Sequence, residues 1–200
     1  VNHNTLTAGD VVVSNGSCTT NVLAPVAKVL NDLCGIERGY MTTVHAYTGD
    51  QPTQDTVHKD LYRARAAALS MIPTSTGTAK AIGRVLPELK GKLHGSSIRV
   101  PTPNVSVIDL AVSTSREVSI DEVNDAIRQT AAGAMSGVLA FTTEPLVSVD
   151  LNHRTESSIV ALPQTDVVDG RMVRVLAWYD NEWSFATRMA DTAVAMAKLI

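Results

Sequence analysis

The stretch VVVSNGSCTTN, Val11–Asn21, places a cysteine directly after a turn that contains glycine. Its β-branched residues predict a buried strand over Val11–Ser14, and the apolar stripe that follows predicts a helix over Cys18–Leu33 that ends at Gly35. Cys18 would then begin a helix, where free N–H groups and the helix dipole favour a thiolate and can also hold an oxyanion. The pattern indicates a nucleophile, although a buried structural cysteine fits the same position.

The composition is typical of a globular protein, with 200 residues, 44% hydrophobic and 18% charged residues, and a net charge of −3. This charge argues against a protein that coats nucleic acid or a membrane surface, and no apolar run has the length of a membrane span. The two cysteines, Cys18 and Cys34, have neither disulfide-framework nor zinc-site spacing. We therefore expect a cytoplasmic protein with reduced thiols, no metal site, no nucleic-acid partner and no membrane partner.

Strands follow one another along the chain more often than they alternate with helices. This order predicts an α+β fold with a largely antiparallel sheet and helices packed on one face. A long polar loop is expected over Thr48–Leu69, a short helix over Thr78–Leu89 broken near Pro87, a helix capped by Ser119 and Glu122, a tight turn at Asp169-Gly170 and a closing helix over Phe185–Ile200. Strands are expected over Tyr40–Tyr47, Ser96–Val100, Val105–Thr114, Leu146–Leu151, Ser157–Leu162 and Met172–Trp178.

His45 lies in the predicted strand YMTTVHAY, just before the long loop. A histidine and a cysteine form a base and nucleophile pair, although a histidine on a strand is equally consistent with a core residue. The segment PTSTGTAK, Pro73–Lys80, opens a helix with hydroxyls and N–H groups that suit a phosphate, and Arg63 and Arg99 offer positive charge. A helix cap and solvated arginines explain the same residues singly. Together with a thiol nucleophile, the residues suggest acyl chemistry on a phosphorylated substrate.

Several motifs in one order resemble the phosphorylating glyceraldehyde-3-phosphate dehydrogenase family of bacterial type over essentially the whole chain. These motifs are SNGSCTTN, TTVHAYTGDQ, HKDLYRARAAALSMIPTSTGTAK, GKLHGSSIRVPTPNVSVIDL, EPLVSVDLN and WYDNEW. The resemblance implies the catalytic part of that family without its N-terminal Rossmann half, and no G-x-G-x-x-G occurs in the sequence. It further implies that residues 1–17 end the dinucleotide-binding domain, that 18–182 form the catalytic domain and that 183–200 form a C-terminal helix.

The resemblance also implies roles for individual residues. Cys18 matches the nucleophile that attacks the aldehyde, and His45 matches its base. By the same matching, Ser17, Thr19, Thr76 and Gly77 bind inorganic phosphate, and Thr48, Asp50, Arg63 and Arg99 bind the phosphate of the substrate. The alternative is that the two phosphates exchange these sites. Asn181 matches the residue that holds a nicotinamide carboxamide. The implied reaction converts glyceraldehyde 3-phosphate and phosphate to 1,3-bisphosphoglycerate through a thioester on Cys18. NAD is the expected cofactor, with NADP as the alternative, and the expected assembly is a homotetramer.

The sequence departs from the family pattern at Val22, where a second cysteine is usual, at Gly16, where alanine is common, and at Ser184-Phe185, where Gly-Tyr is usual. The sister erythrose-4-phosphate dehydrogenases share the thiol and the histidine, but they lack the Ser-Thr-Gly segment that Ser75-Thr76-Gly77 keeps. Aspartate-semialdehyde dehydrogenase lacks HAYTGDQ and WYDNE. The last alternative is an inactive binding or assembly module, because these 200 residues are expected to lack dehydrogenase activity alone.

Overall fold

The computed structural model describes residues 1–199 and contains, within that range, a mixed eight-stranded sheet in the order β2-β3-β1-β4-β8-β6-β5, with β7 paired to β8. Strands β1 and β3 run parallel, as do β5 and β6, and the other five pairs are antiparallel. The predicted α+β class and the largely antiparallel sheet are therefore confirmed. The strands are β1 (Ile36–Ala46), β2 (Ile72–Thr74), β3 (Leu93–Val100), β4 (Ser106–Thr114), β5 (Leu139–Thr142), β6 (Ser158–Ala161), β7 (Asp166–Val168) and β8 (Met172–Tyr179).

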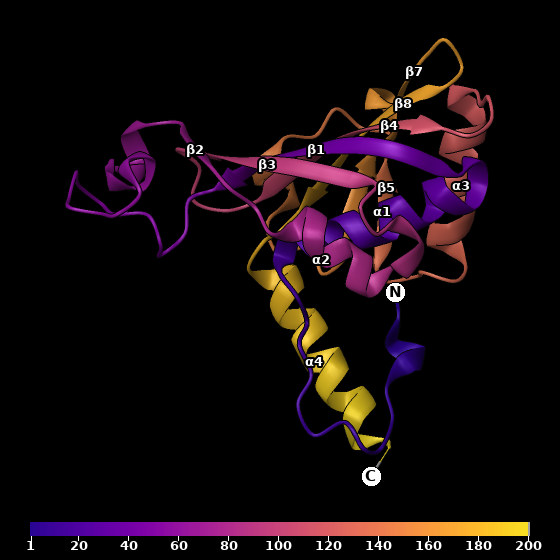
Figure 1. Ribbon diagram of the computed structural model, residues 1–200, viewed down its shortest axis with the longest axis horizontal. Coiled ribbons are helices and arrows are strands. Elements are labelled where there is room, and N and C mark those ends of the chain that lie inside the picture. The colour runs from indigo at the N-terminus through magenta and orange to yellow at the C-terminus, as the bar shows by residue number, and fades with distance from the viewer. Residues whose placement is uncertain (200) are drawn as a thin grey trace.

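Three of the helices lie on one side of the sheet, and the fourth projects away from it (Figure 1). Helix α1 packs across β1, β4, β6 and β8, whereas α2 contacts β3 and α3 contacts β5. The helices are α1 (Cys18–Cys34), α2 (Thr78–Val85), α3 (Ile120–Ala132) and α4 (Trp183–Ala197). Short 3₁₀ turns occur at η1 (His3–Thr5), η2 (Leu61–Ala64), η3 (Ala67–Leu69), η4 (Pro87–Leu89), η5 (Ser148–Leu151) and η6 (Leu162–Gln164).

The hydrophobic core lies between α1 and the centre of the sheet. Burial of an aliphatic side chain of this size contributes about 1.5–3 kcal/mol, so this layer is the main force that fixes α1 on the sheet. Its fully buried members include Val22, Leu23, Val26 and Leu30 from α1, and Ile108, Leu110, Val173 and Val175 from β4 and β8. Because α1 is held along its length, its first residue, Cys18, has a fixed place at one end of the sheet.

Local sequence signals correctly predicted several element boundaries. Helix α1 begins at Cys18 and ends where Gly35 takes a φ of 65°. The Ser119 hydroxyl accepts from the Glu122 N–H while the Glu122 carboxylate accepts from the Ser119 N–H, which is the predicted capping box. Asp169 and Gly170 both have positive φ in the turn before β8. The helix expected over Thr78–Leu89 is also confirmed, with α2 followed by η4 at Pro87.

Two predicted strands were wrong. Val11–Ser14 forms no strand, and Val11 and Val12 are 87% and 89% exposed, because no described strand pairs with them. Leu146–Leu151 contains the 3₁₀ turn η5, in which the Asp150 carboxylate accepts from the Val147 N–H and closes the chain locally. The short strands β2, β5 and β7 were not predicted.

Helix α4 begins at Trp183, two residues before the start at Phe185 that the sequence pattern predicts. The predicted end at Ile200 lies outside the described residues. The N-terminal segment runs beside this helix in Figure 1, and Thr7, Asp10 and Val11 line a small hollow with Met196 of α4. Among residues 1–199, no helix combines the length and the apolar character that crossing a membrane requires.

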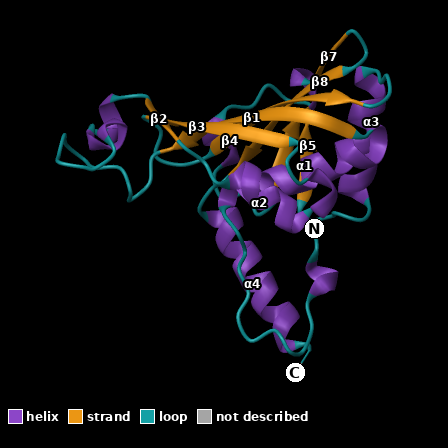
Figure 2. Ribbon diagram, viewed as in Figure 1, coloured by secondary structure: helices purple, strands orange, loops and turns teal. Residues whose placement is uncertain are grey.

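The loop between β1 and β2 extends away from the sheet, with η2 and η3 as its regular turns (Figure 2). It contains the whole of the long polar segment predicted over Thr48–Leu69. Its tip exposes Leu61 and Tyr62, whereas Gln51 and Ala67 at its base are buried. The base of the loop is therefore the part that is packed against the rest of the chain.

Gly39 in β1 is a position where the sheet has no room for a side chain. A Cβ added there would lie 2.6 Å from Val112 Cγ1 and 2.8 Å from the Ala111 carbonyl oxygen. We expect Gly39→Ala to lower the free energy of unfolding by about 1–3 kcal/mol, as overpacking does. Urea-induced unfolding measures this change. The control Gly9→Ala, whose Cβ would meet only Thr7 Oγ1 at 3.8 Å, should change it by less than about 0.5 kcal/mol.

Candidate active site

Cys18 and His45 meet where the start of α1 faces the end of β1. The Cys18 sulfur lies 3.4 Å from Nε2 of His45. Cys18 is half-buried and His45 is buried, so the pair is shielded from bulk solvent while the sulfur keeps some access. Ser17 caps α1 through a hydrogen bond from the Thr20 N–H to its hydroxyl, 3.0 Å long, which fixes the helix start beside the sulfur.

The buried phenol of Tyr179 lies beside the Cys18–His45 pair and contacts residues on both sides of it. Its hydroxyl lies 3.0 Å from Thr19 Oγ1 and 2.9 Å from Thr43 Oγ1, so it joins α1 to β1. Its ring meets the His45 ring edge-on, with centroids 5.8 Å apart. The Thr19 hydroxyl also lies 4.0 Å from the Cys18 sulfur. Tyr179 therefore orients residues on both sides of the Cys18–His45 contact.

The expectation that the helix start lowers the pKa of Cys18 was wrong. Burial raises the pKa of the Cys18 thiol, and this effect outweighs the hydrogen bonds from Thr19 and the charge of Arg99, which lower it. Burial and Arg99 also lower the pKa of His45 from 6.5 to about 4. Both groups are consequently uncharged at neutral pH, and activation of the thiol requires transfer of its proton to a base.

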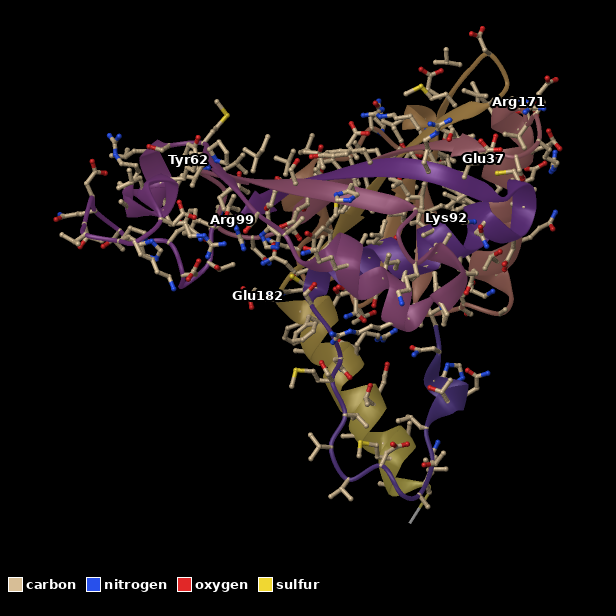
Figure 3. The ribbon with its side chains drawn as sticks, viewed as in Figure 1. Glu37, Tyr62, Lys92, Arg99, Arg171 and Glu182 are labelled. Carbon is tan, nitrogen blue, oxygen red and sulfur yellow. The ribbon has the colours of Figure 1, made fainter. Side chains whose placement is uncertain are left out.

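Arg99 approaches His45 because β1 and β3 pair in parallel with these two residues opposite each other. Arg99 Nη1 lies 2.7 Å from His45 Nδ1 and donates to the Ala46 carbonyl oxygen over 2.9 Å. Its Nε is buried without a partner among the described residues. Figure 3 labels Arg99 at the end of the sheet from which the β1–β2 loop projects. Arg99 thus presents unused donors beside the reactive pair.

Hydroxyls from the starts of two helices form a second group. Ser17 Oγ, before α1, lies 3.4 Å from Thr78 Oγ1 at the first position of α2. Thr76 Oγ1 donates to Thr78 Oγ1 over 3.1 Å, and Gly77 stands between them as the cap of α2. The structure therefore brings Ser17, Thr76 and Gly77 together. The Thr19 hydroxyl points instead to Tyr179 and the Cys18 sulfur. Such a group of hydroxyls and helix N–H groups suits a phosphate.

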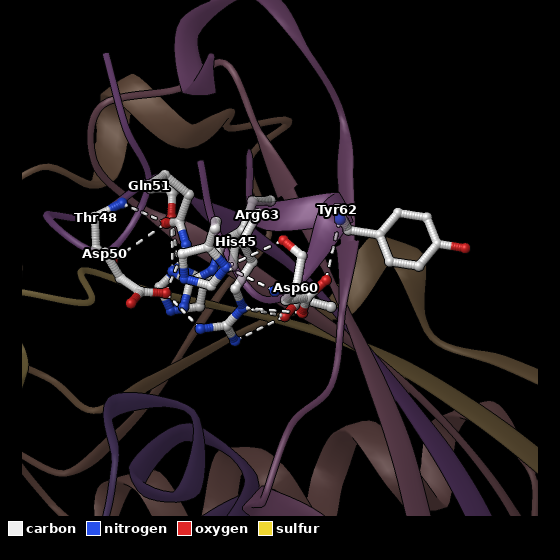
Figure 4. Close-up of polar contacts among 11 residues, drawn as sticks. His45, Thr48, Asp50, Gln51, Asp60, Tyr62 and Arg63 are labelled. Atoms are coloured by element: carbon white, nitrogen blue, oxygen red, sulfur yellow. Dashed lines mark hydrogen bonds and ion pairs between the residues drawn. The ribbon is translucent and has the colours of Figure 1, made fainter. Parts of the chain in front are cut away.

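The base of the β1–β2 loop forms a third group, in which polar side chains converge (Figure 4). Gln51 accepts from the N–H and hydroxyl of Thr48 and donates to the Asp50 carboxylate. Arg63 pairs with Asp50 and donates to Thr74 Oγ1 over 2.7 and 2.9 Å. Thr48, Asp50 and Arg63 are therefore neighbours. Burial lowers the pKa of Arg99, and the charge of Arg63 lowers it further, whereas the charge of Asp50 raises it.

Asn181 is buried after β8 and is connected to the backbone beside His45. The Ser106 hydroxyl donates to Asn181 Oδ1 over 2.8 Å and accepts from the Ala46 N–H over 3.0 Å. Nδ2 of Asn181 makes a longer contact of 3.4 Å with the Glu182 carboxylate. The Asn181 amide is thus held in one orientation, with its oxygen engaged by Ser106.

Sequence reasoning missed Tyr179, Thr43 and Ser106. Thr43 and Ser106 were placed only within predicted strands, and Tyr179 only within the WYDNEW motif. The alternation of strand residues could have indicated that Ser106 is buried, because β4 buries every second side chain, starting with Ser106. Tyr179 lies opposite Ser106 in β8. No group of three or more metal-ligating side chains occurs among the described residues.

We expect Cys18 to be alkylated before Cys34. Cys18 has a neighbouring base and partial exposure, whereas Cys34 is 3% exposed and donates its S–H to the Leu30 carbonyl over 3.0 Å. Mass spectrometry after brief iodoacetamide treatment at neutral pH measures the order of labelling. A Cys18→Ser variant should lose the fast labelling, and faster labelling of Cys34 in the unaltered chain contradicts the assignment.

The low pKa of His45 should make stability depend on pH. The pKa of His45 is about 4 in the folded chain and 6.5 in the unfolded chain. Between these two pH values, His45 therefore takes up a proton in the unfolded chain but not in the folded one. The stabilisation is complete above pH 6.5 and is lost as the pH falls toward 4, by about 3 kcal/mol in all. Urea unfolding at pH 7 and pH 4.5 should show a smaller loss in His45→Gln than in the unaltered chain, and equal losses contradict the shift.

We compared the sequence with family models and with known proteins, and the matches agree on one family. Residues 17–181 match the family described as glyceraldehyde 3-phosphate dehydrogenase, C-terminal domain. Proteins named glyceraldehyde-3-phosphate dehydrogenase are 68% identical over 200 residues in Cereibacter sphaeroides, 67% over 199 in Xanthobacter flavus and 57% over 197 in Pseudomonas aeruginosa. These alignments cover 98–100% of this chain but only 58–60% of each relative's length. The chain therefore belongs to the glyceraldehyde-3-phosphate dehydrogenase family and corresponds to its C-terminal catalytic domain.

Proposed function

We propose that this chain is the catalytic part of a glycolytic dehydrogenase that converts D-glyceraldehyde 3-phosphate and phosphate to 1,3-bisphosphoglycerate. The observation that carries this proposal is the 3.4 Å contact between Cys18 and His45 at the start of α1. Two polar groups suited to phosphate lie around it, one at the joined starts of α1 and α2 and one at the base of the β1–β2 loop. A thiol nucleophile between two phosphate-binding groups fits a substrate that carries one phosphate and receives another.

In the proposed reaction, His45 takes the proton of the Cys18 thiol, and the sulfur adds to the aldehyde carbon. The oxyanion of this adduct lies near the N–H groups at the start of α1. Loss of a hydride from the same carbon leaves a thioester on Cys18. An oxygen of inorganic phosphate then attacks the thioester carbon, the carbon–sulfur bond breaks, and the thiolate of Cys18 is regenerated.

Two sets of residues position the phosphates in this proposal. Ser17, Thr76 and Gly77 hold the attacking phosphate, and Thr48, Asp50, Arg63 and Arg99 hold the phosphate of the substrate. The Thr19 hydroxyl faces Tyr179 and the Cys18 sulfur, so its place in the first set rests on the family resemblance. Arg99 fits this role through its unpartnered Nε. Arg63 is already paired with Asp50, so an anion at Arg63 competes with that carboxylate.

The family implies a nicotinamide dinucleotide, NAD or alternatively NADP, and only one part of it fits these residues. The buried amide of Asn181, oriented by Ser106, fits a carboxamide partner. No G-x-G-x-x-G occurs in the 200 residues to hold a pyrophosphate, and residues 1–17 are proposed as the end of the domain that does so. The chemistry that the nicotinamide supplies when bound is acceptance of one hydride.

A cytoplasmic homotetramer is part of the same proposal and rests on the family alone. Erythrose 4-phosphate is the second candidate substrate, since a thiol and histidine pair serves any aldose phosphate. The segment Ser75-Thr76-Gly77 favours glyceraldehyde 3-phosphate. The Thr76 side chain hydrogen-bonds to Thr78 and so belongs to the cluster of hydroxyls at the start of α2, which suits free phosphate.

The proposal is tested by comparing the chain alone with a chimera that carries, upstream of it, the preceding residues of the Cereibacter sphaeroides relative. We expect the chain alone, checked for folding by circular dichroism, to form no NADH from glyceraldehyde 3-phosphate, phosphate and NAD, because most dinucleotide contacts are lacking. We expect the chimera to be active. His45→Asn in the chimera should lower kcat by about 10²–10⁴ and move the pH optimum to alkaline values, since a general base is lost.

Thr130→Val is the matched control, because it removes a hydroxyl that bonds only to the Ala126 carbonyl within α3, and its kcat should remain unchanged. A chimera that oxidises erythrose 4-phosphate with a higher kcat/KM selects the second candidate. A folded chimera that oxidises neither aldehyde contradicts the proposed function.

A further inference from the structure

Gln51 is the buried centre of the polar group at the base of the β1–β2 loop. Its Oε1 accepts from the Thr48 N–H over 2.9 Å and from the Thr48 hydroxyl over 3.3 Å. Its Nε2 donates to Asp50 Oδ2 over 3.1 Å, and Figure 4 draws these contacts together. Only 6% of Gln51 is exposed. Gln51 thus links two residues of the proposed phosphate-binding set without being a member of it.

The groups around Gln51 fix the orientation of its amide. A backbone N–H only donates, and an ionised carboxylate only accepts. Oε1 therefore faces Thr48 and Nε2 faces Asp50, because the reverse orientation would break both hydrogen bonds. The Gln51 N–H also donates to the Thr48 carbonyl oxygen over 2.9 Å, so main chain and side chain close the same turn. The amide is consequently held in one arrangement.

Asp50 connects the Gln51 amide to Arg63. The Asp50 oxygen that accepts from Gln51, Oδ2, also accepts from Arg63 Nη1. From the other side, Thr74 Oγ1 accepts from Nε and Nη2 of Arg63 over 2.9 and 2.7 Å. A guanidinium has five N–H groups, and these contacts use three of them, so one is left on each terminal nitrogen. Two such donors suit two oxygens of one phosphate.

Asp50 is unexpected in a phosphate-binding group, because two anions at close range repel each other. Its position is explained if it serves to hold Arg63, since Oδ2 is engaged by both Arg63 and Gln51. The other carboxylate near Arg63 is that of Asp60, 3.7 Å from Nε. The second cation is Arg99, on which the charges of Arg63 and Asp50 both act. Within the described residues, Asp50 is the one of these two carboxylates that a buried side chain holds in place.

We propose that Gln51 is a positioning residue, which holds Asp50 against Arg63 and so keeps two N–H groups of Arg63 available to a bound phosphate group. This role rests on the proposed function, in which Thr48 and Arg63 bind a phosphate. The Thr48 hydroxyl can turn to that phosphate, because its contact with Gln51 is the longer one, whereas the shorter contact from the Thr48 N–H keeps Gln51 in place. Gln51 touches no substrate and acts through Asp50.

The first test compares two aldehydes in the chimera with the Cereibacter sphaeroides residues: glyceraldehyde 3-phosphate and glyceraldehyde, which lacks the phosphate. Gln51→Glu keeps the size of the side chain and its acceptor for Thr48, but it sets a second carboxylate against Asp50. We expect the ratio of kcat/KM for the two aldehydes to fall by about tenfold or more, because hydrogen bonds to charged groups contribute that much to binding. Damage to the fold or to the reactive pair would lower both constants together and leave the ratio unchanged.

Two further changes serve as controls. Gln54→Glu adds the same charge at an exposed position of the same loop, where the side chain makes no hydrogen bond with the described residues, and should change the ratio by less than about twofold. Asp50→Asn, alone and together with Gln51→Glu, completes a double-mutant cycle, in which the double variant keeps the net charge of the unaltered chain. Because the double variant exchanges amide and carboxylate between the two positions, we expect a coupling of at least about threefold, whereas independent effects of charge on the phosphate would be additive.

The second test measures binding without turnover. Line broadening in ³¹P spectra gives the Kd of glycerol 3-phosphate and of inorganic phosphate for the chimera, and fluorescence quenching gives the Kd of NAD. Gln51→Glu should raise the Kd of the phosphate that Arg63 binds by about tenfold or more, and an unchanged Kd of NAD shows that the variant is folded. If Gln51→Glu does not fold, Gln51→Met takes its place, because it removes the amide and keeps a side chain of similar size.

The outcomes separate a failed role of Gln51 from a failed proposed function. A weaker Kd for glycerol 3-phosphate, with a lower aldehyde ratio, supports the role and assigns it to the phosphate of the substrate; a weaker Kd for inorganic phosphate alone supports it for the attacking phosphate. If the unaltered chimera binds phosphate but Gln51→Glu changes neither Kd nor the ratio, if the cycle is additive, or if Gln54→Glu has an equal effect, the role of Gln51 is overturned and the function stands. If the unaltered chimera binds neither ligand, the proposed phosphate sites and the role of Gln51 fail together.

Discussion

The contact between the Cys18 sulfur and the His45 ring depends on how α1 is seated on the sheet. Cys18 is the first residue of a helix whose apolar stripe is buried along its length, and His45 stands near the end of the long central strand β1. Neither residue belongs to the exposed tip of the β1–β2 loop. The hydrophobic layer between helix and sheet therefore sets the distance between sulfur and base, and the polar groups of the site are arranged around that fixed pair.

Burial gives this site its chemical character. The same enclosure that holds the pair raises the pKa of Cys18 and lowers that of His45, so the resting pair is uncharged. A helix start favours a thiolate only as far as its N–H groups and dipole outweigh the loss of water around the sulfur. Tyr179 shows the same balance, since burial raises the pKa of its phenol and keeps it a neutral hydrogen-bonding bridge.

Much of the architecture could be predicted because its signals are local. The capping box at Ser119, the end of α1 at Gly35 and the turn at Asp169-Gly170 depend on residues a few positions apart. Cys18 and His45 were found from short motifs for the same reason. Val11–Ser14 was predicted wrongly because β-branched residues favour a strand only where a partner strand exists. Strands β2, β5 and β7 were missed because they form by pairing with distant parts of the chain rather than through local propensity.

The contacts among Tyr179, Thr43 and Ser106 could not be predicted, because they depend on the register among β1, β4 and β8. The register of β1 against β3 has a further consequence for how the length of this chain can vary. Successive strand residues face opposite sides of a sheet, so a shift of β3 by one position would carry Arg99 away from His45 to the other face. Insertions and deletions can therefore accumulate at the exposed tip of the β1–β2 loop, whereas inside β3, ahead of Arg99, a single added or lost residue would separate the arginine from the site.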